Sequence, residues 1–441
     1  TAPVPSQYFS DFLKLLRPLC EHTDKATWAG IDQRDAGSTY EVPYWIWSRV
    51  SDSVAELLDA GKNEDPLVFK WGNIVRYIEL ARCCISGTGA EIALHIPPVE
   101  DVQAYANAKH RLFMSASIKD MSSLITALDC DQTACGRLIE PAEDEGAGER
   151  MILPISLINP ESKKDEIACA CQQLATQTNV VVLTSSGSQA KVWTEAGATL
   201  HKGTNVDNAI DLLRSSNGNF FVFAQRFDGV DLPDNACRIL VIDGVPRGDR
   251  IIDQVDAYRQ KNSPEYDVRT VNKFEQALGR AVRSSADFAA VLLVGPDVAA
   301  FIGRNDVIGL LEDRTRLQTE LGRKITAAVA QAGNAIGTTI AEVTSALLSR
   351  DEGWKESHRE YVKVPEKRPR VNVLNAYEHA ALALRCAWLM AKSRNFQQAV
   401  TGLRDAANGD LHAIQKAELL YWVGAYLHQF DQARASEVYQ S

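Results

Sequence analysis

Two arginines three positions apart give the most specific chemical signal in this chain. They lie in residues 276–283, Q-A-L-G-R-A-V-R, which have the pattern Q-x-x-G-R-x-x-R. Because residues three and four apart share one side of a helix, we expect Gln276, Arg280 and Arg283 to lie on one helix face. Planar guanidinium donors aimed together suit a phosphate whose negative charge grows during transfer. The pattern therefore predicts a phosphoryl-transfer site, with a solvated basic helix face as the alternative.

Two shorter segments could take part in the same chemistry. Residues 227–233, F-D-G-V-D-L-P, directly follow the apolar run 220–224. Gly229 would let the backbone approach a ligand closely, and Asp231 could accept a hydrogen bond from a ribose hydroxyl. An ordinary strand-end turn is the alternative, because Asp-Gly is common in turns. The second segment is 115–117, S-A-S, whose small hydroxyls could relay between sites, or form a turn or a helix N-cap.

Residues 151–305 contain the elements that must position these segments. Apolar runs at 179–183, 220–224, 238–242 and 289–294 are separated by helical patterns. Near-continuous apolar strands alternating with helices predict a parallel sheet that is covered on both faces. Ligands of such sheets bind beyond the carboxyl ends of the strands, where the 227–233 segment falls.

The regions on either side of residues 151–305 have patterns typical of structural elements and contain no group of catalytic residues. Residues 1–90 have helical periodicity, residues 91–96 alternate like a strand that stops at Pro97-Pro98, and residues 141–150 are acidic and glycine-bearing like a linker. Residues 306–441 return to helical patterns, for which a plain helical bundle is favoured over a helical repeat. We expect Trp354, Trp388 and Trp422 to be core aromatics.

Composition limits the classes of protein. A length of 441 residues, with 45% hydrophobic and 24% charged residues, predicts a globular protein of several domains. The apolar runs are far shorter than the about 20 residues that span a bilayer. Nine cysteines without a disulfide framework indicate reduced thiols and a cytoplasmic location. The net charge of -10 argues against coating nucleic acid by bulk attraction, but it leaves room for a local groove.

The order of the segments resembles that of superfamily 2 helicases, nearest to the DEAD/DEAH-like and DNA-repair branches. S-A-S at 115–117 is followed by G-x-D-x-P at 229–233, D-G-V-P at 243–246 and Q-x-x-G-R-x-x-R at 276–283. The segment G-E-R-M-I-L at 148–153 is also similar to bacterial helicases of antiviral defence or repair. This resemblance covers residues 111–295 and implies an α/β fold: a RecA-like parallel-sheet motor domain with helical N-terminal and C-terminal regions.

The resemblance also implies a division of the chain and a role for each motif. Residues 1–90 would be a helical insertion or remnant of the first motor domain, 91–140 its last strands, 141–150 a linker, 151–305 the second RecA-like domain and 306–441 a helical accessory domain. Gln276, Arg280 and Arg283 would reach the γ-phosphate of ATP as arginine fingers, and Gly229 and Asp231 would bridge the nucleotide and the strand. The backbone of a single nucleic-acid strand, DNA in our expectation, would be contacted by Thr184, Ser185, Ser186 and Lys202. Coupling of hydrolysis to movement would fall to Ser115, Ala116 and Ser117, where Ser117 replaces the family's usual Thr.

Two elements of such a motor are absent from these 441 residues. There is no G-x-x-x-x-G-K-[ST] phosphate loop, and no apolar strand leads into a D-E-x-H box. We therefore expect this chain to be a fragment that is inactive alone, with Mg²⁺ ligands and phosphate loop supplied by a missing first motor half. A partner protein such as a nuclease is also possible in such systems. The alternatives are a non-hydrolysing helicase-like scaffold that binds partner proteins, and a nucleotide-binding α/β enzyme with a glycine-rich loop after its first strand.

Overall fold

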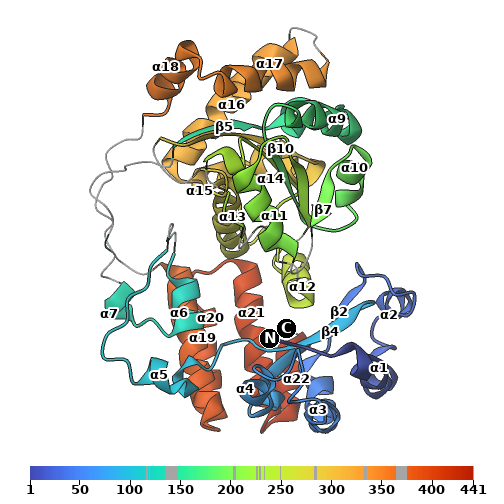
Figure 1. Cartoon of the computed structure of the whole chain (residues 1–441). Helices are drawn as coiled ribbons and strands as arrows, with labels where there is room; N and C mark the ends of the chain where they lie inside the picture. The colour runs from blue at the N-terminus through green and yellow to red at the C-terminus, as the bar shows by residue number, and fades with distance from the viewer. Residues whose placement is uncertain are drawn as a thin grey trace. The chain divides into compact units, whose positions relative to one another are not determined.

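The computed structural model forms two compact units, each made of separate segments of the chain (Figure 1). Unit 1 is Thr1–Ile139, Gly248–Tyr266 and Arg370–Ser441, and unit 2 is Glu140–Arg247 and Asp267–Pro369. The structure describes residues 1–115, 118, 120–135, 139, 148–201, 205–224, 227, 230–232, 234–248, 250–282, 286–331, 335–363 and 375–440. Within these ranges, no helix combines the length and apolar character needed to cross a bilayer.

Unit 2 is built on a six-stranded sheet in which every pairing is parallel. The strand order is β5-β10-β9-β6-β8-β7. The strands are β5 (Glu149–Leu153), β6 (Val180–Thr184), β7 (Thr199–His201), β8 (Phe220–Ala224), β9 (Ile239–Asp243) and β10 (Phe288–Val294). Every residue of β6, β8 and β9 is buried, as expected of strands covered on both faces.

The side chains of each strand alternate between two cores on opposite faces of the sheet. In β6, Val181 and Leu183 belong to one core cluster, and Val180 and Val182 belong to the other. The first face is covered by α11 (Asn205–Ser215), α13 (Pro264–Leu278), α14 (Pro296–Gly303) and α15 (Asn305–Leu310). The second is covered by α9 (Lys164–Ala175), α10 (Ala190–Glu195), α16 (Asp313–Gln331), α17 (Ile336–Leu348) and α18 (Glu352–Tyr361). The predicted α/β fold, with a parallel sheet covered by helices on both faces, is confirmed for unit 2.

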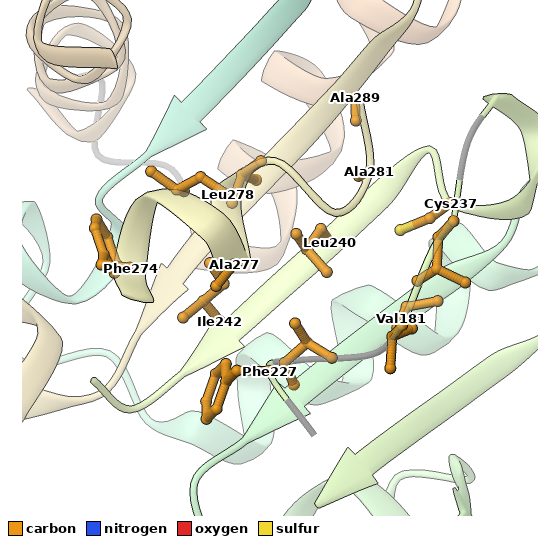
Figure 2. Packing of buried hydrophobic residues seen from close by; sticks show 14 of the residues in the cluster. Val181, Phe227, Cys237, Leu240, Ile242, Phe274, Ala277, Leu278, Ala281 and Ala289 are labelled. Atoms are coloured by element: carbon orange, nitrogen blue, oxygen red, sulfur yellow. The ribbon is translucent and has the colours of Figure 1, made fainter. Parts of the chain in front are cut away.

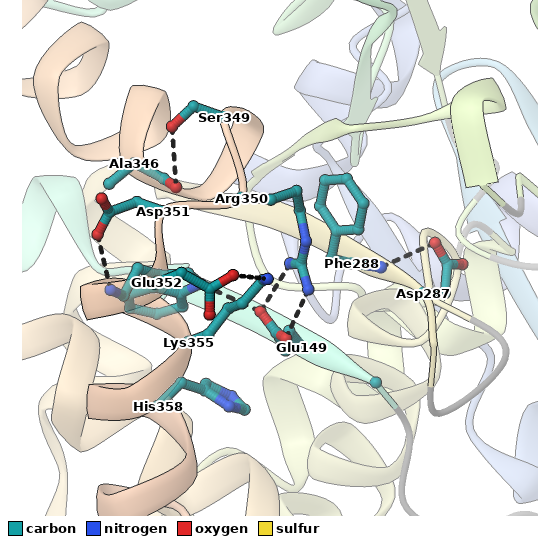
Figure 3. A network of polar contacts seen from close by, with 12 residues as sticks. Glu149, Asp287, Phe288, Ala346, Ser349, Arg350, Asp351, Glu352, Lys355 and His358 are labelled. Atoms are coloured by element: carbon teal, nitrogen blue, oxygen red, sulfur yellow. Dashed lines mark hydrogen bonds and ion pairs between the residues drawn. The ribbon is translucent and has the colours of Figure 1, made fainter.

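Figure 2 shows how α13 seals the first face. Phe274, Ala277 and Leu278 of this helix lie in the same cluster as Leu240 and Ile242 of β9, and all five side chains are fully buried. On the other face, the end of α17 and the start of α18 are tied to β5 by the ion pair of Arg350 with Glu149 (Figure 3). The two helices therefore belong to the sheet domain.

The single accessory domain predicted for residues 306–441 is wrong. The helices α16, α17 and α18 supply Leu321, Ile340, Val343, Leu347 and Trp354 to the core of unit 2, because the second face of the sheet needs an apolar cover. The remaining helices belong to unit 1: α19 (Ala376–Lys392), α20 (Phe396–Ala407), α21 (Ala413–His428) and α22 (Gln432–Gln440). The linker predicted at residues 141–150 extends two residues too far, because β5 begins at Glu149. Residues 140–147 lie outside the described residues.

Unit 1 contains a four-stranded antiparallel sheet with the order β1-β4-β3-β2. Its strands are β1 (Ala2–Pro3), β2 (Thr39–Glu41), β3 (Ala81–Ser86) and β4 (Gly89–Leu94). The helices predicted in residues 1–90 are present as α1 (Ser6–Cys20), α2 (Lys25–Asp32), α3 (Tyr44–Asp59) and α4 (Trp71–Val75), but three strands in this region were missed. Because β4 pairs antiparallel on both sides, the prediction that residues 91–140 form the last strands of a RecA-like sheet is wrong for the described residues.

The segment 248–266 leaves the sheet domain and joins unit 1. Its helix α12 (Ile251–Arg259) buries Ile252 and Val255 against Cys84 of β3 and Ala93 of β4. Arg82 of β3 also donates to Asp256 at 2.7 Å and to Glu41 at 2.8 Å. These apolar and ionic contacts place residues 248–266 outside the 151–305 domain to which the sequence assigned them.

The last four helices form a core around large aromatic side chains. Each of α19, α20 and α21 packs against the next helix along the chain. Trp388 and Tyr426 are fully buried, and Trp422 is nearly so. Together with buried Trp354 in unit 2, this confirms the core role predicted for the three tryptophans.

Candidate functional site

The carboxyl ends of three neighbouring strands meet at one edge of the sheet in unit 2. Thr184 at the end of β6 pairs with Asp243 at the end of β9, which in turn pairs with Val294 at the end of β10. Gly244 and Gly295 follow with φ of 100° and 106°, a backbone conformation that favours glycine. The Gly244 amide donates to the Val294 carbonyl at 3.2 Å, which holds the loops after β9 and β10 together.

Asp243 is the buried charge of this edge. Its side chain accepts hydrogen bonds from Lys164 Nζ and from Trp193 Nε1, each at 2.7 Å. Burial raises the pKa of Asp243, and the hydrogen bond and charge of Lys164 only partly oppose that rise. Neither Lys164 nor Trp193 was predicted as a site residue. A signal was present, because a carboxylate that ends a fully apolar strand needs a partner.

Ser185 and Ser186 lie at this edge, where the sequence predicted contact with a nucleic-acid backbone. Ser185 Oγ donates to Gln189 Oε1 at 2.6 Å, and Ser186 Oγ accepts from the main-chain N–H of Gln189 at 3.2 Å. These bonds organise the turn that begins α10 and leave both residues partly exposed. Thr184 is fully buried, and its hydroxyl donates to the Ser186 carbonyl, so its predicted contact with a strand does not fit this structure. Lys202 lies outside the described residues.

Arg280 lies in a turn rather than on a helix. Because α13 ends at Leu278, the expectation that Gln276 and Arg280 share one helix face is wrong. Gly279 disfavours continuation of the helix, and Ala281 beyond the turn is buried in the core of the sheet. Gln276 is exposed in the last turn of α13, and Arg283 lies outside the described residues.

The structure joins Arg280 to the segment at 227–232. Arg280 Nε donates to the Phe227 carbonyl at 3.0 Å, and Nη1 lies 3.5 Å from the Val230 carbonyl. The Arg280 carbonyl accepts from the Leu232 amide at 3.2 Å. Two motifs about fifty residues apart in sequence therefore share one hydrogen-bonded site, and Phe227 packs in the same core cluster as α13 (Figure 2).

Asp231, the acidic residue of the 227–232 segment, interacts with Arg214. The Asp231 carbonyl accepts from Arg214 Nη2 at 3.2 Å, and the Asp231 carboxylate lies 3.7 Å from the same atom. Both side chains are about half exposed, so this ion pair contributes little to stability. Gly229 lies outside the described residues.

The S-A-S segment belongs to the other unit. Ser115 is exposed in unit 1, while Ala116 and Ser117 lie outside the described residues. The residues predicted for ATP and strand contact that the structure describes all belong to unit 2. Among the described residues, no group of three or more His, Cys, Asp or Glu side chains is arranged to hold a metal ion.

Residues 171–299 match the family described as Helicase C-terminal domain. This stretch runs from α9 to α14 and includes Ser185, Asp243 and Arg280. The match agrees with the resemblance to a helicase C-terminal half that the motifs of this stretch indicated. No curated protein matches the chain.

Among solved structures, the chain is similar to an XPD helicase. The sequence identity is 15% and the TM-score is 0.35. The match covers 57% of this chain and 52% of the helicase, so this chain spans about half the length of that structure.

Proposed function

We propose that unit 2 is the second motor domain of a superfamily 2 helicase that acts on a single strand of nucleic acid, with DNA as the expected strand. The observation that carries this proposal is the match of residues 171–299 to a helicase C-terminal domain. Support comes from the hydrogen bonds between Arg280 and residues 227–232, which join two motifs that such a motor uses together. In such motors, ATP closes two motor domains over the strand, and hydrolysis reopens them.

Arg280 is the residue that we propose for contact with the γ-phosphate of ATP, with Gln276 and Arg283 beside it in sequence. A guanidinium that already binds two carbonyl oxygens has the planar donor geometry that also fits phosphate oxygens. When bound, ATP would supply the phosphoryl group whose hydrolysis drives movement. An arginine in this role accelerates such hydrolysis by about 10³- to 10⁵-fold.

The proposed ATP site is incomplete on this chain. The 441 residues contain neither a phosphate loop nor an acidic box that would hold Mg²⁺. We propose that a first motor half supplies both, and that this chain alone does not hydrolyse ATP. Hydrolysis by the purified chain at a rate that single-stranded DNA stimulates would contradict this part of the proposal.

For the strand itself, we propose contact through Ser185 and Ser186 at the carboxyl edge of β6. Hydroxyl groups that contact sugar and phosphate fix a strand without reading its bases. Such a local contact is compatible with the net charge of -10, because only the groove needs to attract the backbone.

A double substitution tests the strand contact. Ser185→Glu with Ser186→Glu places two negative charges at the carboxyl edge, and we expect affinity for a labelled single-stranded oligonucleotide to fall by about tenfold or more at low salt. The matched control is Ser215→Glu with Ser216→Glu, an exposed serine pair at the end of α11 that precedes the amino end of β8. Fluorescence anisotropy measures both, and circular dichroism checks that each variant folds. Equal binding by both double variants would remove the 185–186 turn from the strand site.

A second candidate function is a non-hydrolysing scaffold that binds partner proteins. It is favoured by one observation: Arg280 is already bound to main-chain carbonyls within its own unit. The two functions differ in the motor assembled with a phosphate-loop domain. Arg280→Lys should abolish most strand-stimulated ATP hydrolysis if Arg280 contacts phosphate, whereas a scaffold would have no such hydrolysis to lose.

A further inference from the structure

Two cysteines in unit 1 bring their sulfur atoms into contact. Cys130 follows α6 (Ser122–Leu128), and Cys135 is the last residue of α7 (Gln132–Cys135); both helices are labelled in Figure 1. The Cys135 thiol lies 3.6 Å from Cys130 Sγ, and both residues are buried. Neither cysteine takes part in the proposed motor site.

Local folding holds the two thiols together. Asp129 ends α6 in a left-handed conformation, with φ of 50°, and accepts a hydrogen bond from Arg385 Nε at 2.9 Å. Asp131 caps α7, because its carboxylate accepts from the Ala134 amide at 2.7 Å and its carbonyl accepts from the Cys135 amide at 3.0 Å. The chain therefore doubles back over five residues, and the thiols meet inside a small apolar cluster with Met121, Ile125 and Ala381.

We propose that Cys130 and Cys135 form a redox-sensitive dithiol that a small-molecule disulfide, such as oxidised glutathione, converts to an intramolecular disulfide. A disulfide requires a sulfur–sulfur distance of about 2 Å. The thiols already lie at 3.6 Å, so rotation of the two side chains and a small shift of the short helix α7 bring them within bonding distance. This modification site is independent of the proposed helicase function.

Oxidised glutathione accepts the two electrons that the two cysteine thiols lose when their disulfide forms. One cysteine thiolate attacks a sulfur of oxidised glutathione, which forms a mixed disulfide and releases one glutathione thiolate. The second cysteine thiolate then attacks the protein sulfur of the mixed disulfide and releases the second glutathione. Two protein thiols are oxidised to one disulfide, one glutathione disulfide is reduced to two thiols, and the two protons pass to the released glutathione thiolates.

Burial determines how fast this exchange runs. It raises the pKa of the Cys135 thiol to about 12 and also raises the pKa of Cys130. Because the thiolate is the attacking species, oxidation should be slow at neutral pH and become faster as the pH rises. The short distance between the thiols favours the disulfide at equilibrium, whatever the rate.

The experiment uses the full chain equilibrated with a series of glutathione redox mixtures at pH 8, then quenched with an alkylating agent. Trypsin cleavage after Lys119 and Arg137 gives a peptide, 120–137, that contains both cysteines. We expect it to lose two hydrogen atoms and remain unalkylated. The same series in concentrated urea measures the unfolded chain. We expect the folded chain to form this disulfide at about a tenfold lower ratio of oxidised to reduced glutathione, because folding has already brought the thiols together.

Two internal controls sharpen the result. Cys171 is buried, with a pKa that burial alone raises to about 12, and should stay a thiol in the folded chain. In Cys135→Ser, Cys130 should form at most a mixed disulfide with glutathione. A wild-type peptide that stays fully alkylated, that carries stable glutathione, or that oxidises as readily in the unfolded chain would overturn the proposal.

Discussion

Arg280 binds main-chain oxygens in this structure, which gives it a structural role beside its proposed role toward phosphate. Its guanidinium donates to the carbonyls of Phe227 and Val230, and its own carbonyl accepts from Leu232. These contacts fasten the segment after β8 to the turn after α13. An assay of Arg280 variants must therefore separate loss of stability from loss of phosphate contact.

We predict that Arg280→Ala lowers the free energy of unfolding of unit 2 by about 1–3 kcal/mol, because partly buried carbonyls lose their donor. Urea denaturation followed by fluorescence measures this loss. Arg214→Ala is the matched control, since Arg214 contacts the same segment at Asp231 but is about half exposed. It should change stability by less than about 1 kcal/mol. Equal effects of the two substitutions would show that Arg280 does not hold the segment.

Glu149 is a second residue whose charge is tied to folding (Figure 3). Its carboxylate accepts two hydrogen bonds from Arg350 at 2.8 Å each and one from Trp354 Nε1 at 3.2 Å. Burial by itself raises the pKa of Glu149, but the hydrogen bonds and charge of Arg350 outweigh it, so the pKa lies below its usual value. The ionised form is therefore the one that the folded state favours.

We predict that Glu149→Gln destabilises unit 2 near pH 7 and has a much smaller effect near pH 3. A carboxyl whose pKa is lower when folded adds stability above its unfolded pKa of about 4.3, and that stability is lost as the pH falls through the folded pKa. Urea denaturation across this pH range measures the difference between variant and wild type. Glu356→Gln, at an exposed position of α18, the helix that contains Trp354, should shift stability by less than about 0.5 kcal/mol at either pH. A pH-independent effect of Glu149→Gln would contradict the ion pair's role.

Only part of the site could be predicted from residue types. Ser185 and Ser186 follow an unmistakable apolar strand, so their place at the sheet edge was predictable. Lys164 and Trp193 were not, because they lie on helices 79 and 50 residues away from Asp243 in sequence. The helix face expected for Arg280 failed because α13 ends at Leu278, directly before Gly279, a weak helix former.

At the scale of elements, one ion pair joins the start of α9 to the end of β9. Asp243 is fully buried, whereas Lys164 retains 30% exposure of its side chain. We predict that Lys164→Met lowers stability by about 2–4 kcal/mol, because Asp243 is left as a buried charge without its cation. Asp243→Asn added to that variant should restore at least half of the loss, since an amide oxygen can still accept from Trp193 Nε1.

A double-mutant cycle by urea denaturation checks the coupling. The loss caused by Lys164→Met should also shrink in mild acid, because protonation removes the unpaired charge of Asp243. Additive effects of the two substitutions would contradict the interaction between the α9 lysine and the β9 carboxylate.

The contact of α16 with β5 depends on the absence of a side chain at Gly322. A Cβ there would lie 1.7 Å from the Ile152 carbonyl oxygen, which is main chain and cannot rotate away. We predict that Gly322→Ala lowers stability by about 2 kcal/mol or more, because the helix must move off the strand. Gly309→Ala in α15 is the control: nothing lies within 4 Å of the added methyl, so the change should be neutral or stabilising by up to about 1 kcal/mol. Thermal and urea unfolding measure both, and a stable Gly322→Ala variant would refute the close approach.

The strands that were predicted correctly are almost completely buried. The strands β6, β8, β9 and β10 are apolar apart from the end residues Thr184 and Asp243, so their positions followed from the sequence. The strand β5 opens with Glu149 and Arg150, whose partners Arg350 and Gln318 lie more than 160 residues away, and its polar start was predicted as linker. The hairpin of β3 and β4 turns at Gly87-Thr88, and that two-residue signal was overlooked.

At the scale of the whole molecule, the two units could not be predicted from the order of the elements along the chain, because each unit combines separate segments. Unit 1 gathers three separate segments and unit 2 gathers two. Each core cluster formed by the described residues is drawn from a single unit. No local sequence pattern predicts that residues 248–266 belong to unit 1. They belong there because α12 packs against β3 and β4.

Separate cores predict separate unfolding. Leu240 of β9 and Leu403 of α20 are both fully buried, in clusters of unit 2 and unit 1 respectively. Each Leu→Ala change should lower the stability of its own unit by about 2–5 kcal/mol through lost burial and the cavity that remains. Differential scanning calorimetry should show two transitions, with Leu240→Ala lowering the Tm of one and Leu403→Ala lowering the Tm of the other. A single transition that both substitutions lower equally would mean that the interleaved segments unfold as one cooperative body, and a function assigned to unit 2 could then not be studied apart from unit 1.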